Sequence, residues 1–552
     1  MKKKDPKELA ALQGFAERDE LASAMALCRK LLRKHPGDPE LLLAMGQLAF
    51  RAADYKSAAE FLRRAMGLMP ARQEAHLLHG MCLMYLGDLS AALLALDKAV
   101  QLFPDSFDLY NNRSVIRRME GLTAEALEDC DRALRIDASH PAVYNNRGIV
   151  YMDLHRYDLA QADFEVATRY APDYPDAHYN LGRVLAYQGR YEQGLAELEQ
   201  AIRLQPDHSQ AHLEKAFALY RKGFVAEFWQ LYAIWRWVGK EEDLSRHNRA
   251  CPEWHPHSTA RRLLVWGEQG VGDEVLYCST LASYHYAASL TVAADARLLP
   301  ILERSFPDIQ FIDRQRGGSV EASCESQISL GGLARYLRPD SASFSLQPVS
   351  FLQADPEKSD HFRRALQSAA PAALRCGVAW RSSNPVLGQD KSCKLEYFMG
   401  LLSVPGIQLI DLQYGDTAAE REHFLQLTGT EILSDPSLDR FHDLDGLCAL
   451  IAACDVVVTT SNVTAHLAAA LGKPTCVMVP SGAGQMWYWH HDQGYCPWYP
   501  TARICEQPTP GDWVGAIHLA RQQLAGENMV MRGNANLTGK DSYITSEYLG
   551  ND

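Results

Sequence analysis

Residues 141–174 read PAVYNNRGIVYMDLHRYDLAQADFEVATRYAPDY, and this 34-residue stretch recurs with variation from Asp5 to about residue 238. One proline position repeats in register. Pro36, Pro70, Pro104, Pro172 and Pro206 are separated by 34, 34, 68 and 34 residues, and Ala138 fills the missing place. A fixed period of this length predicts a stack of small helical units that bury their apolar faces against one another.

Small residues occupy three columns of the repeat when each proline is taken as position 32. Units then begin at Asp5, Pro39, Gln73, Phe107, Pro141, Pro175 and, in degenerate form, Ser209. Position 8 holds Gly46, Gly80, Ser114, Gly148 and Gly182; position 20 holds Ala24, Ala58, Ala92, Ala126, Ala160 and Gly194; position 27 holds Ala65, Ala99, Ala133, Ala167 and Ala201. Small side chains let two antiparallel helices pack closely, and glycine turns and the proline separate the helices. The pattern resembles the tetratricopeptide repeat over residues 5–238, which implies an α-helical solenoid.

A column of asparagines marks one face of this solenoid. Asn112, Asn146 and Asn180 occupy position 6 of three successive units, although Ala44 and Leu78 interrupt the column in earlier ones. Carboxamides one repeat apart can hydrogen-bond an extended peptide backbone whatever its side chains. The column resembles the asparagine ladder of the nucleocytoplasmic O-GlcNAc transferases, so these residues are predicted to bind a protein acceptor in the concave groove. Alternatively, they only solvate a helix face.

The seventh unit is aromatic, whereas the outer face of a terminal repeat is normally polar. Its aromatic side chains are Phe224, Phe228, Trp229, Tyr232, Trp235 and Trp237. We expect the following domain to cover them, and an external partner is the alternative. The repeat domain is therefore predicted to span residues 1–238, with a linker at 239–258 that contains Pro252, Trp254 and Pro256.

After residue 258, short β-rich runs alternate with helical stretches. The predicted strands are Leu263–Trp266, Leu290–Ala293, Ile309–Ile312, Gly377–Trp380, Ile407–Leu412, Asp455–Thr459 and Thr475–Val479. This alternation is typical of doubly wound parallel sheets, which bind ligands at the carboxyl ends of their strands. A break near Ala369-Ala370-Pro371 divides it into two Rossmann-like lobes, residues 259–370 and 371–525. The polar tail 526–552 is predicted to be flexible.

Each lobe carries one motif whose residues are suited to ligand binding or catalysis. Residues 263–274, LLVWGEQGVGDE, read as a strand, a glycine-rich turn and a helix start. Gly270 and Gly272 let backbone N–H groups approach a ligand, and the helix start favours anions. Asp273 can serve either as a helix cap or as a general base.

The second motif, DVVVTTSNVTAHLAAALGKP at residues 455–474, reads as a buried strand, a polar turn and an alanine-rich helix. Asn462 or Thr464 can cap that helix, and N–H groups at 463–465 can hold phosphate oxygens. His466, in the first turn, is close enough to hydrogen-bond the same anion. Its alternative role is that of an ordinary helix residue.

These motifs resemble the two-lobed GT-B glycosyltransferases of the heptosyltransferase type. Gly272-Asp273 match the motif that supplies the catalytic aspartate in that family. Residues 466–472 with Pro474 match the second-lobe motif, whereas Ser461-Asn462 replace its Asp-Thr. Bacterial proteins that fuse tetratricopeptide repeats to such a module are more similar still. They share Pro252, Trp254, Glu268-Gln269-Gly270, Pro497-Trp498-Tyr499-Pro500 and Gly511-Asp512-Trp513. Some members are similar to transferases that glycosylate flagellin.

The resemblance implies a set of donor-binding residues around Asp273 as the catalytic base. The predicted donor site comprises Gly270, Gly272, Trp380, Arg381, Asn384, Lys391, Gln413, Tyr414, Ser461, Asn462, Val463, Thr464 and His466. Lys391 would neutralise the leaving phosphate without a metal, or it is a solvated loop lysine. Gln413 and Tyr414 are candidates for nucleobase contacts. Trp487, Trp489, His490 and Asp492 either stack on a substrate or fill the core.

The composition limits the partners. The 552 residues carry a formal net charge of −13, which disfavours nucleic acid and anionic membranes as main partners. No apolar run reaches the ~18–20 residues that span a bilayer, and no signal peptide is recognisable, so a cytoplasmic location is predicted. The 13 cysteines lack paired spacing, which predicts reduced thiols. No metal-binding motif is present, so neither a metal nor another cofactor is expected.

The predicted function is that of a bacterial, metal-independent, inverting glycosyltransferase. It would move a sugar from a nucleotide-activated donor to Ser or Thr hydroxyls of a protein held by the repeat groove, with flagellin as the suspected acceptor. Two alternatives stay open: a transferase acting on a lipid or polysaccharide precursor, and an inactive repeat scaffold or chaperone. The donor stays open between a nucleoside diphosphate sugar and a CMP-linked nonulosonic acid.

Overall fold

The computed structural model describes residues 6–236, 251–284, 289–315, 324–371, 373–384, 387–489 and 494–525. The predicted tail at 526–552, most of the predicted linker, and Trp237, His490 and Asp492 lie outside these ranges. The chain divides into two compact units, Met1–Ala211 and His212–Asp552, and each is described by itself.

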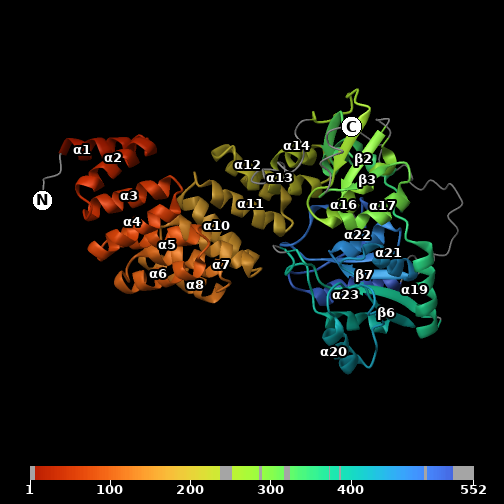
Figure 1. The fold of residues 1–552 in the computed structure, drawn as a ribbon. Coiled ribbons are helices and arrows are strands. Elements are labelled where there is room, and N and C mark those ends of the chain that lie inside the picture. Colours follow the sequence, from red (N-terminus) through yellow and green to blue (C-terminus); the bar gives the residue numbers. More distant parts are fainter. Residues whose placement is uncertain are drawn as a thin grey trace, which may run out of the picture. The chain divides into compact units, whose positions relative to one another are not determined.

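The first unit consists of antiparallel helix pairs stacked in chain order (Figure 1). Its helices are α1 (Pro6–Glu17), α2 (Leu21–Lys34), α3 (Pro39–Arg51), α4 (Tyr55–Leu68), α5 (Gln73–Tyr85), α6 (Leu89–Leu102), α7 (Phe107–Met119), α8 (Thr123–Ile136), α9 (Pro141–Asp153), α10 (Tyr157–Tyr170), α11 (Pro175–Tyr187) and α12 (Tyr191–Leu204). From α3 onward, each predicted unit start is the first residue of a helix. The predicted helical solenoid is confirmed.

Glycine at position 8 lies where the two helices of a pair meet. A Cβ on Gly148 would lie 2.6 Å from the Phe164 ring, and a Cβ on Gly182 would lie 2.7 Å from Leu198. The close approach therefore requires glycine opposite a large side chain. Ser114 takes this position opposite the smaller Cys130.

Two arginines, Arg113 (buried) and Arg147 (half-buried), link successive helix pairs of this unit. Arg147 on α9 donates from Nε and Nη2 to the two carboxylate oxygens of Asp163 on α10, both at 2.8 Å. Its Nη1 donates at 2.7 Å to Asp131 on α8, in the preceding pair. Arg113 makes the same pattern of bonds one unit earlier. Each arginine thus joins its own pair to the preceding one by charge-assisted hydrogen bonds.

The second unit contains most of α13 (Ser209–Arg221), then α14 (Val225–Trp235) and a first, fully parallel sheet of order β3-β2-β1-β4. The elements of this first lobe, residues 262–337, are β1 (Arg262–Trp266), α16 (Val271–Cys278), η1 (Leu281–Ser283), β2 (Ser289–Ala294), η2 (Ala296–Leu298), α17 (Leu299–Ser305), β3 (Gln310–Asp313), β4 (Ser326–Ser329) and α18 (Leu330–Leu337). η5 (Ala342–Leu346) and α19 (Pro356–Ala369) lead to the next lobe.

The second lobe, residues 374–525, has a sheet of order β6-β5-β7-β8-β10-β9 in which only β9 is antiparallel. Its elements are β5 (Leu374–Ala379), η6 (Leu395–Ser403), β6 (Ile407–Asp411), α20 (Ala418–Thr428), α21 (Leu444–Ala453), β7 (Val456–Thr460), α22 (Val463–Ala470), β8 (Thr475–Val479), η7 (Trp487–Trp489), β9 (Tyr495–Cys496), β10 (Tyr499–Glu506) and α23 (Trp513–Ala525). Each predicted strand is present in one of the two parallel sheets, whereas β4, β9 and β10 were not predicted.

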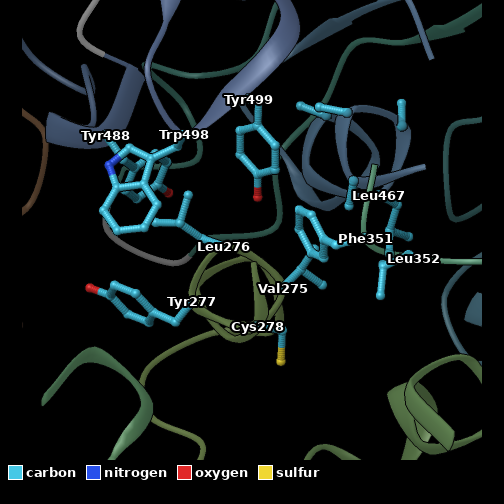
Figure 2. Close-up of a cluster of buried hydrophobic side chains, with 14 of the residues drawn as sticks. Val275, Leu276, Tyr277, Cys278, Phe351, Leu352, Leu467, Tyr488, Trp498 and Tyr499 are labelled. Atoms are coloured by element: carbon cyan, nitrogen blue, oxygen red, sulfur yellow. The ribbon is translucent and has the colours of Figure 1, made fainter. Parts of the chain in front are cut away.

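One apolar cluster joins the two lobes, and helix α16 of the first contacts α22 of the second. Figure 2 shows part of this cluster, with Val275 and Leu276 on α16 and Leu467 on α22. Phe351 and Leu352 add to it, and the backbone N–H of each donates to the Ala470 carbonyl. The glycine-rich turn of the first lobe is thereby held against the start of α22.

Three aromatic side chains of α14, Phe228, Trp229 and Tyr232, are buried in the same cluster, as predicted for a cover by the following domain, whereas Trp235 is half-buried and Phe224 is exposed. Trp229 donates from its indole nitrogen to the Arg338 carbonyl at 2.8 Å, and Phe228 packs on Trp487 with ring centroids 4.7 Å apart. These contacts place the boundary between the compact units at Ala211, whereas the sequence predicted a domain end at residue 238.

The described end of the predicted linker pairs with β4 like an extra strand. Trp254 N–H donates to the Gln327 carbonyl at 2.8 Å, and Trp254 is buried. The sulfur atoms of Cys251 and Cys324 lie 2.7 Å apart, a pairing that the cysteine spacing did not predict. Within the described ranges, no helix combines the length and the apolar character needed to cross a bilayer.

Candidate functional site

A pocket of about 330 Å³ lies between the two lobes, and we call it the inter-lobe pocket. It is lined by Gly270, Val271, Gly272, Asp273, Arg297, Ser382, Ser383, Asn384, Lys391, Tyr414, Arg440, Phe441, Leu444, Ser461, Asn462, Val463, His466, Met486 and Tyr488. Ten residues of the predicted site are among these: Gly270, Gly272, Asp273, Asn384, Lys391, Tyr414, Ser461, Asn462, Val463 and His466. Residues from the ends of several strands thus meet in one place, as parallel sheets predict.

Asp273 is the third residue of α16 and lies at the pocket wall of the first lobe. Its Oδ2 accepts the Gly270 N–H at 3.1 Å, so the carboxylate closes the glycine-rich turn. The turn itself contains Gln269 at φ 61°, and the Gln269 amide donates to the Tyr232 hydroxyl at 3.0 Å. Both roles predicted for Asp273 therefore remain compatible with its position: it caps the helix, and it faces the pocket.

Asn462 caps α22, and both the oxygen and the nitrogen of its side-chain amide are hydrogen-bonded within the protein. Its Oδ1 accepts the Ala465 N–H at 3.3 Å and the Thr459 hydroxyl at 3.1 Å. Its Nδ2 donates to the Arg381 carbonyl at 3.1 Å. Of the two caps predicted, the structure uses Asn462, and Thr464 is fully buried. The replacement of Asp-Thr by Ser461-Asn462 therefore keeps a capped helix start at the pocket.

Lys391 is 6% exposed, and its ammonium makes no hydrogen bond or ion pair with any residue in the described part of the chain. Burial lowers the pKa of Lys391, and attraction to Asp273 of the first lobe opposes that shift. A buried cation without a counterion is costly, so the position favours an anionic ligand in the pocket.

His466 is 2% exposed and lies in the first turn of α22. Its Nδ1 is 2.9 Å from the Tyr499 hydroxyl, and a Cβ on Gly272 would lie 3.1 Å from its Nε2. Burial, and secondarily the charge of Lys391, lowers the pKa of His466 to about 3. The imidazole is therefore neutral near pH 7.

Four residues of the predicted donor site lie outside the pocket lining: Trp380, Arg381, Gln413 and Thr464. Gln413 accepts the backbone N–H groups of Trp380 and Arg381 at 2.8 and 2.7 Å, so its amide shapes the turn after β5. The Arg381 guanidinium pairs with Glu420 at 3.0 Å, and the Trp380 indole donates to the same carboxylate at 2.9 Å. These side chains therefore stabilise the segment after β5 and do not line the pocket themselves.

Sequence reasoning missed several residues of the lining because they come from loops without a recognisable motif. Arg297, in the short helix η2 that follows β2, pairs with Asp295 at 2.9 Å and donates to the Phe441 carbonyl at 3.1 Å. Arg440 is buried and bonds to backbone carbonyls. Of the residues that were predicted to stack or to fill the core, Trp487 and Trp489 are buried in the core.

The asparagine column of the first unit bonds partly within the solenoid. Asn146 Nδ2 donates to Asn111 Oδ1 of the preceding repeat at 2.8 Å, and Asn180 Nδ2 donates to Asn145 Oδ1 at 3.0 Å. Asn112 donates to a carbonyl of its own helix at 2.9 Å. The amide N–H groups of Asn146 and Asn180 thus connect repeats, a use that the predicted peptide ladder did not include.

Comparison with known proteins supports the repeats. Residues 77–141, 145–193 and 180–236 match the family model "Tetratricopeptide repeat", and residues 17–99 match "Anaphase-promoting complex, cyclosome, subunit 3". Protein FlbA of Caulobacter vibrioides is 28% identical over 320 residues, which cover 54% of this chain and 52% of FlbA. The chain thus spans about half the length of the curated relative it matches.

Some solved structures are similar to part of this chain. The APC/C hetero-tetramer Cut9–Hcn1 matches 40% of this chain and 46% of its own, with 17% identity and a TM-score of 0.36. YrrB, described as a tetratricopeptide-repeat protein with an unusual peptide-binding site, matches 33% of this chain and 95% of its own, with 22% identity and a TM-score of 0.27. From the repeat period, the helix pairs and the family match together, the N-terminal part of the chain carries tetratricopeptide repeats.

Proposed function

We propose that this protein is a glycosyltransferase that moves a sugar from a nucleotide-activated donor to Ser or Thr hydroxyls of a protein acceptor. One observation carries the proposal: a carboxylate of the first lobe shares a pocket with a helix N-terminus of the second lobe and with an ammonium that pairs with no described residue. These groups belong to Asp273, Lys391 and Val463. Two parallel sheets that flank one pocket are compatible with the GT-B arrangement that the motifs resemble.

The second-lobe wall suits the phosphate of the donor. The N–H groups of Val463 and Thr464 are the first two of α22, and they donate to no acceptor within the described ranges. Together with Lys391 they supply positive charge where an anion can sit. Sugar transfer releases the nucleotide with additional charge on its phosphate, so fixed positive groups at this wall would lower the barrier without a metal.

Asp273 on the opposite wall is the proposed base. It would take the proton of the acceptor hydroxyl while that oxygen forms the new bond to the anomeric carbon. The bond from that carbon to the phosphate oxygen breaks, and the nucleotide leaves with the electron pair. Attack from the side opposite the leaving group inverts the anomeric centre.

The repeats supply the protein-binding surface for the acceptor. The side-chain oxygens of Asn112, Asn146 and Asn180 accept no hydrogen bond within the described ranges. Asn112 and Asn146 are partly exposed and remain able to accept peptide N–H groups, whereas Asn180 is only 4% exposed. Tethering the acceptor in this way would raise its effective concentration at the pocket. Flagellin is the acceptor we propose to test first, because of the resemblance to flagellin-modifying transferases.

The Asp273→Asn variant tests the proposal, because asparagine keeps an oxygen for the Gly270 N–H but cannot take a proton. Each variant is expressed with a flagellin in a bacterium that makes nucleotide sugars, and the flagellin is weighed by intact mass spectrometry. Asp273→Asn is expected to slow glycan addition by about 10²-fold or more. Asp308→Asn, an exposed carboxylate of the same lobe, is the matched control and should leave the mass increase unchanged. Undiminished modification by Asp273→Asn would rule out Asp273 as the base.

Two alternative functions are separated by a second variant. Replacing Asn112, Asn146 and Asn180 together by alanine should lower transfer to protein while hydrolysis of the donor persists. Persistent transfer to a lipid or polysaccharide fraction instead would favour the precursor-modifying alternative. Absence of both transfer and donor hydrolysis in the wild-type protein, across nucleoside diphosphate sugars and CMP-linked sugars, would favour the scaffold.

A further inference from the structure

The environment of His466 determines which of its ring nitrogens carries the hydrogen. The imidazole is enclosed by three aromatic rings: those of Tyr488, Trp489 and Tyr499 lie at 5.2, 4.9 and 5.7 Å between centroids. Its Nδ1 meets the Tyr499 hydroxyl at 2.9 Å. Its Nε2 lies on the edge that faces Gly272 and the inter-lobe pocket. The two nitrogens therefore have different surroundings, and the ring cannot flip without displacing its neighbours.

The hydrogen bond between His466 and Tyr499 favours one tautomer of the histidine. Tyr499 is 1% exposed, and Nδ1 of His466 is the one partner of its hydroxyl among the described residues. If Nδ1 carried the hydrogen and donated to the tyrosine oxygen, the hydroxyl hydrogen would be buried without an acceptor, which is strongly disfavoured. If the hydroxyl donates to a bare Nδ1, every hydrogen at this contact is bonded. The second arrangement leaves the ring hydrogen on Nε2.

We propose that Tyr499 is a positioning residue that holds His466 as its Nε2–H tautomer, so that an uncharged N–H donor faces an oxyanion in the inter-lobe pocket. This proposal rests on the proposed function for the nature of the ligand, a donor phosphate, but its assignment of the tautomer does not. Figure 2 shows the Tyr499 hydroxyl directed toward α16, the helix that begins at the glycine-rich turn on the other side of the pocket.

The arrangement has a functional consequence. A protonated histidine beside Lys391 would repel it, whereas a neutral Nε2–H donor supports the same anion without adding charge. Depression of the His466 pKa by burial agrees with a neutral ring. The affinity for an anion should therefore not change when the pH passes through the ordinary range of histidine titration. The histidine contributes a hydrogen bond of defined direction and no charge.

The tautomer of His466 can be measured directly in the wild-type protein. In ¹⁵N NMR of histidine-labelled full-length protein, the protonated and bare nitrogens of a neutral imidazole are well separated, and the His466 signals are identified by their loss in His466→Gln. The proposal expects a protonated Nε2 in the wild type and a loss of this preference in Tyr499→Phe. Tyr277→Phe removes a buried hydroxyl that has no described partner, and it should leave the tautomer unchanged. A protonated Nδ1 in the wild type, or an unchanged Nε2–H in Tyr499→Phe, would overturn it.

Binding of uridine diphosphate and cytidine monophosphate tests whether the Nε2–H group of His466 donates a hydrogen bond to the ligand. Glutamine places its amide nitrogen near the position of Nε2, and asparagine places its amide nitrogen near Nδ1. His466→Asn is expected to weaken nucleotide binding by about tenfold, since a hydrogen bond to a charged group is lost, and His466→Gln should weaken it less. Equal losses in the two variants would contradict the Nε2–H donor. If the tautomer is as expected but neither nucleotide binds the wild type, the donor site of the proposed function fails while the assignment of Tyr499 stands.

Discussion

At the residue scale, the turn within each helix pair of the first unit needs a left-handed residue. Gly87, Gly121 and Gly189 take this position at φ between 75° and 81°, and Asp19, Ala53 and His155 take it at 57°, 57° and 56°. A left-handed conformation costs an L-residue about 1–2 kcal/mol, and glycine avoids this cost. The repeat therefore predicts glycine here in every unit, and three units depart from it.

Ala53→Gly is expected to stabilise the first unit by up to about 1 kcal/mol, since relief of the left-handed strain outweighs the added freedom of the unfolded chain. Ala53 is exposed, so no packing is lost. The neighbouring Ala52→Gly is the control: Ala52 is also exposed, but its φ is −82°, so glycine there should destabilise. Urea unfolding followed by circular dichroism measures both, and a lower stability for Ala53→Gly than for Ala52→Gly would contradict the argument.

His466 gives the second unit a pH dependence of defined sign. The folded-state pKa is about 3 and the ordinary value is 6.5, so the unfolded chain binds more protons between these values. The free energy of unfolding should therefore fall as the pH decreases from 6.5, by up to about 1.4 kcal/mol per pH unit. His466→Gln should flatten this part of the profile, and the exposed His257→Gln should not. Calorimetric Tm values across this pH range provide the measurement, and parallel profiles for wild type and His466→Gln would refute the expectation.

Residues of the site were predictable from the sequence where a motif placed them at the end of a strand. Asp273, Lys391 and His466 line one pocket as expected, because each comes after the carboxyl end of a strand in the parallel sheet of its own lobe. Gln413 was assigned to the same edge, yet its amide turns inward to the backbone of Trp380. The direction of a side chain depends on the hydrogen bonds of its neighbours, which the spacing of one segment does not contain.

At the scale of elements, glycine at position 8 sets how closely the two helices of a repeat approach. Gly148→Ala is expected to destabilise the first unit by about 1–3 kcal/mol, because the new Cβ would lie 2.6 Å from the buried Phe164 ring. Gly67→Ala in α4 is the matched control, since a Cβ there meets nothing within 4 Å and alanine favours helix. Thermal unfolding of the two variants should therefore shift in opposite directions. A stabilising Gly148→Ala would show that the pair can separate at little cost.

From α3 onward, the start of the first helix in each repeat was predictable to the residue because each unit repeats the same local pattern, and one proline fixes the register. The strands of the parallel sheets were predictable where they form apolar runs, as in β7 and β8. The strand β10 was missed because it contains Pro500 and Arg503 and lacks such a run. Its strand character comes from pairing with β8, a contact between distant segments that a single-sequence pattern does not show.

At the scale of the whole molecule, the last repeat belongs physically to the second unit. Phe228, Trp229 and Tyr232 of α14 are buried against Trp487. Arg236, just after α14, lies 3.1 Å from the buried Glu268 at the start of the glycine-rich turn. The end of the repeats therefore supports the turn that carries the proposed base. A boundary drawn at the end of the repeat pattern would cut through this core.

Two fragments test this division of the chain. A fragment of residues 212–552 is expected to be soluble and cooperatively folded, whereas one of residues 239–552 should aggregate or bind a hydrophobic dye. Burial of each large aromatic side chain contributes about 1.5–3 kcal/mol, so loss of those on α14 removes much of a typical stability of about 5–15 kcal/mol. The fragment 1–211 is the control and should show the helical circular dichroism of the remaining repeats. Size-exclusion chromatography and thermal unfolding compare the three. A well-folded, monodisperse 239–552 fragment would show that α14 only rests on the lobes, and the boundary predicted from the repeat period would then be the physical one.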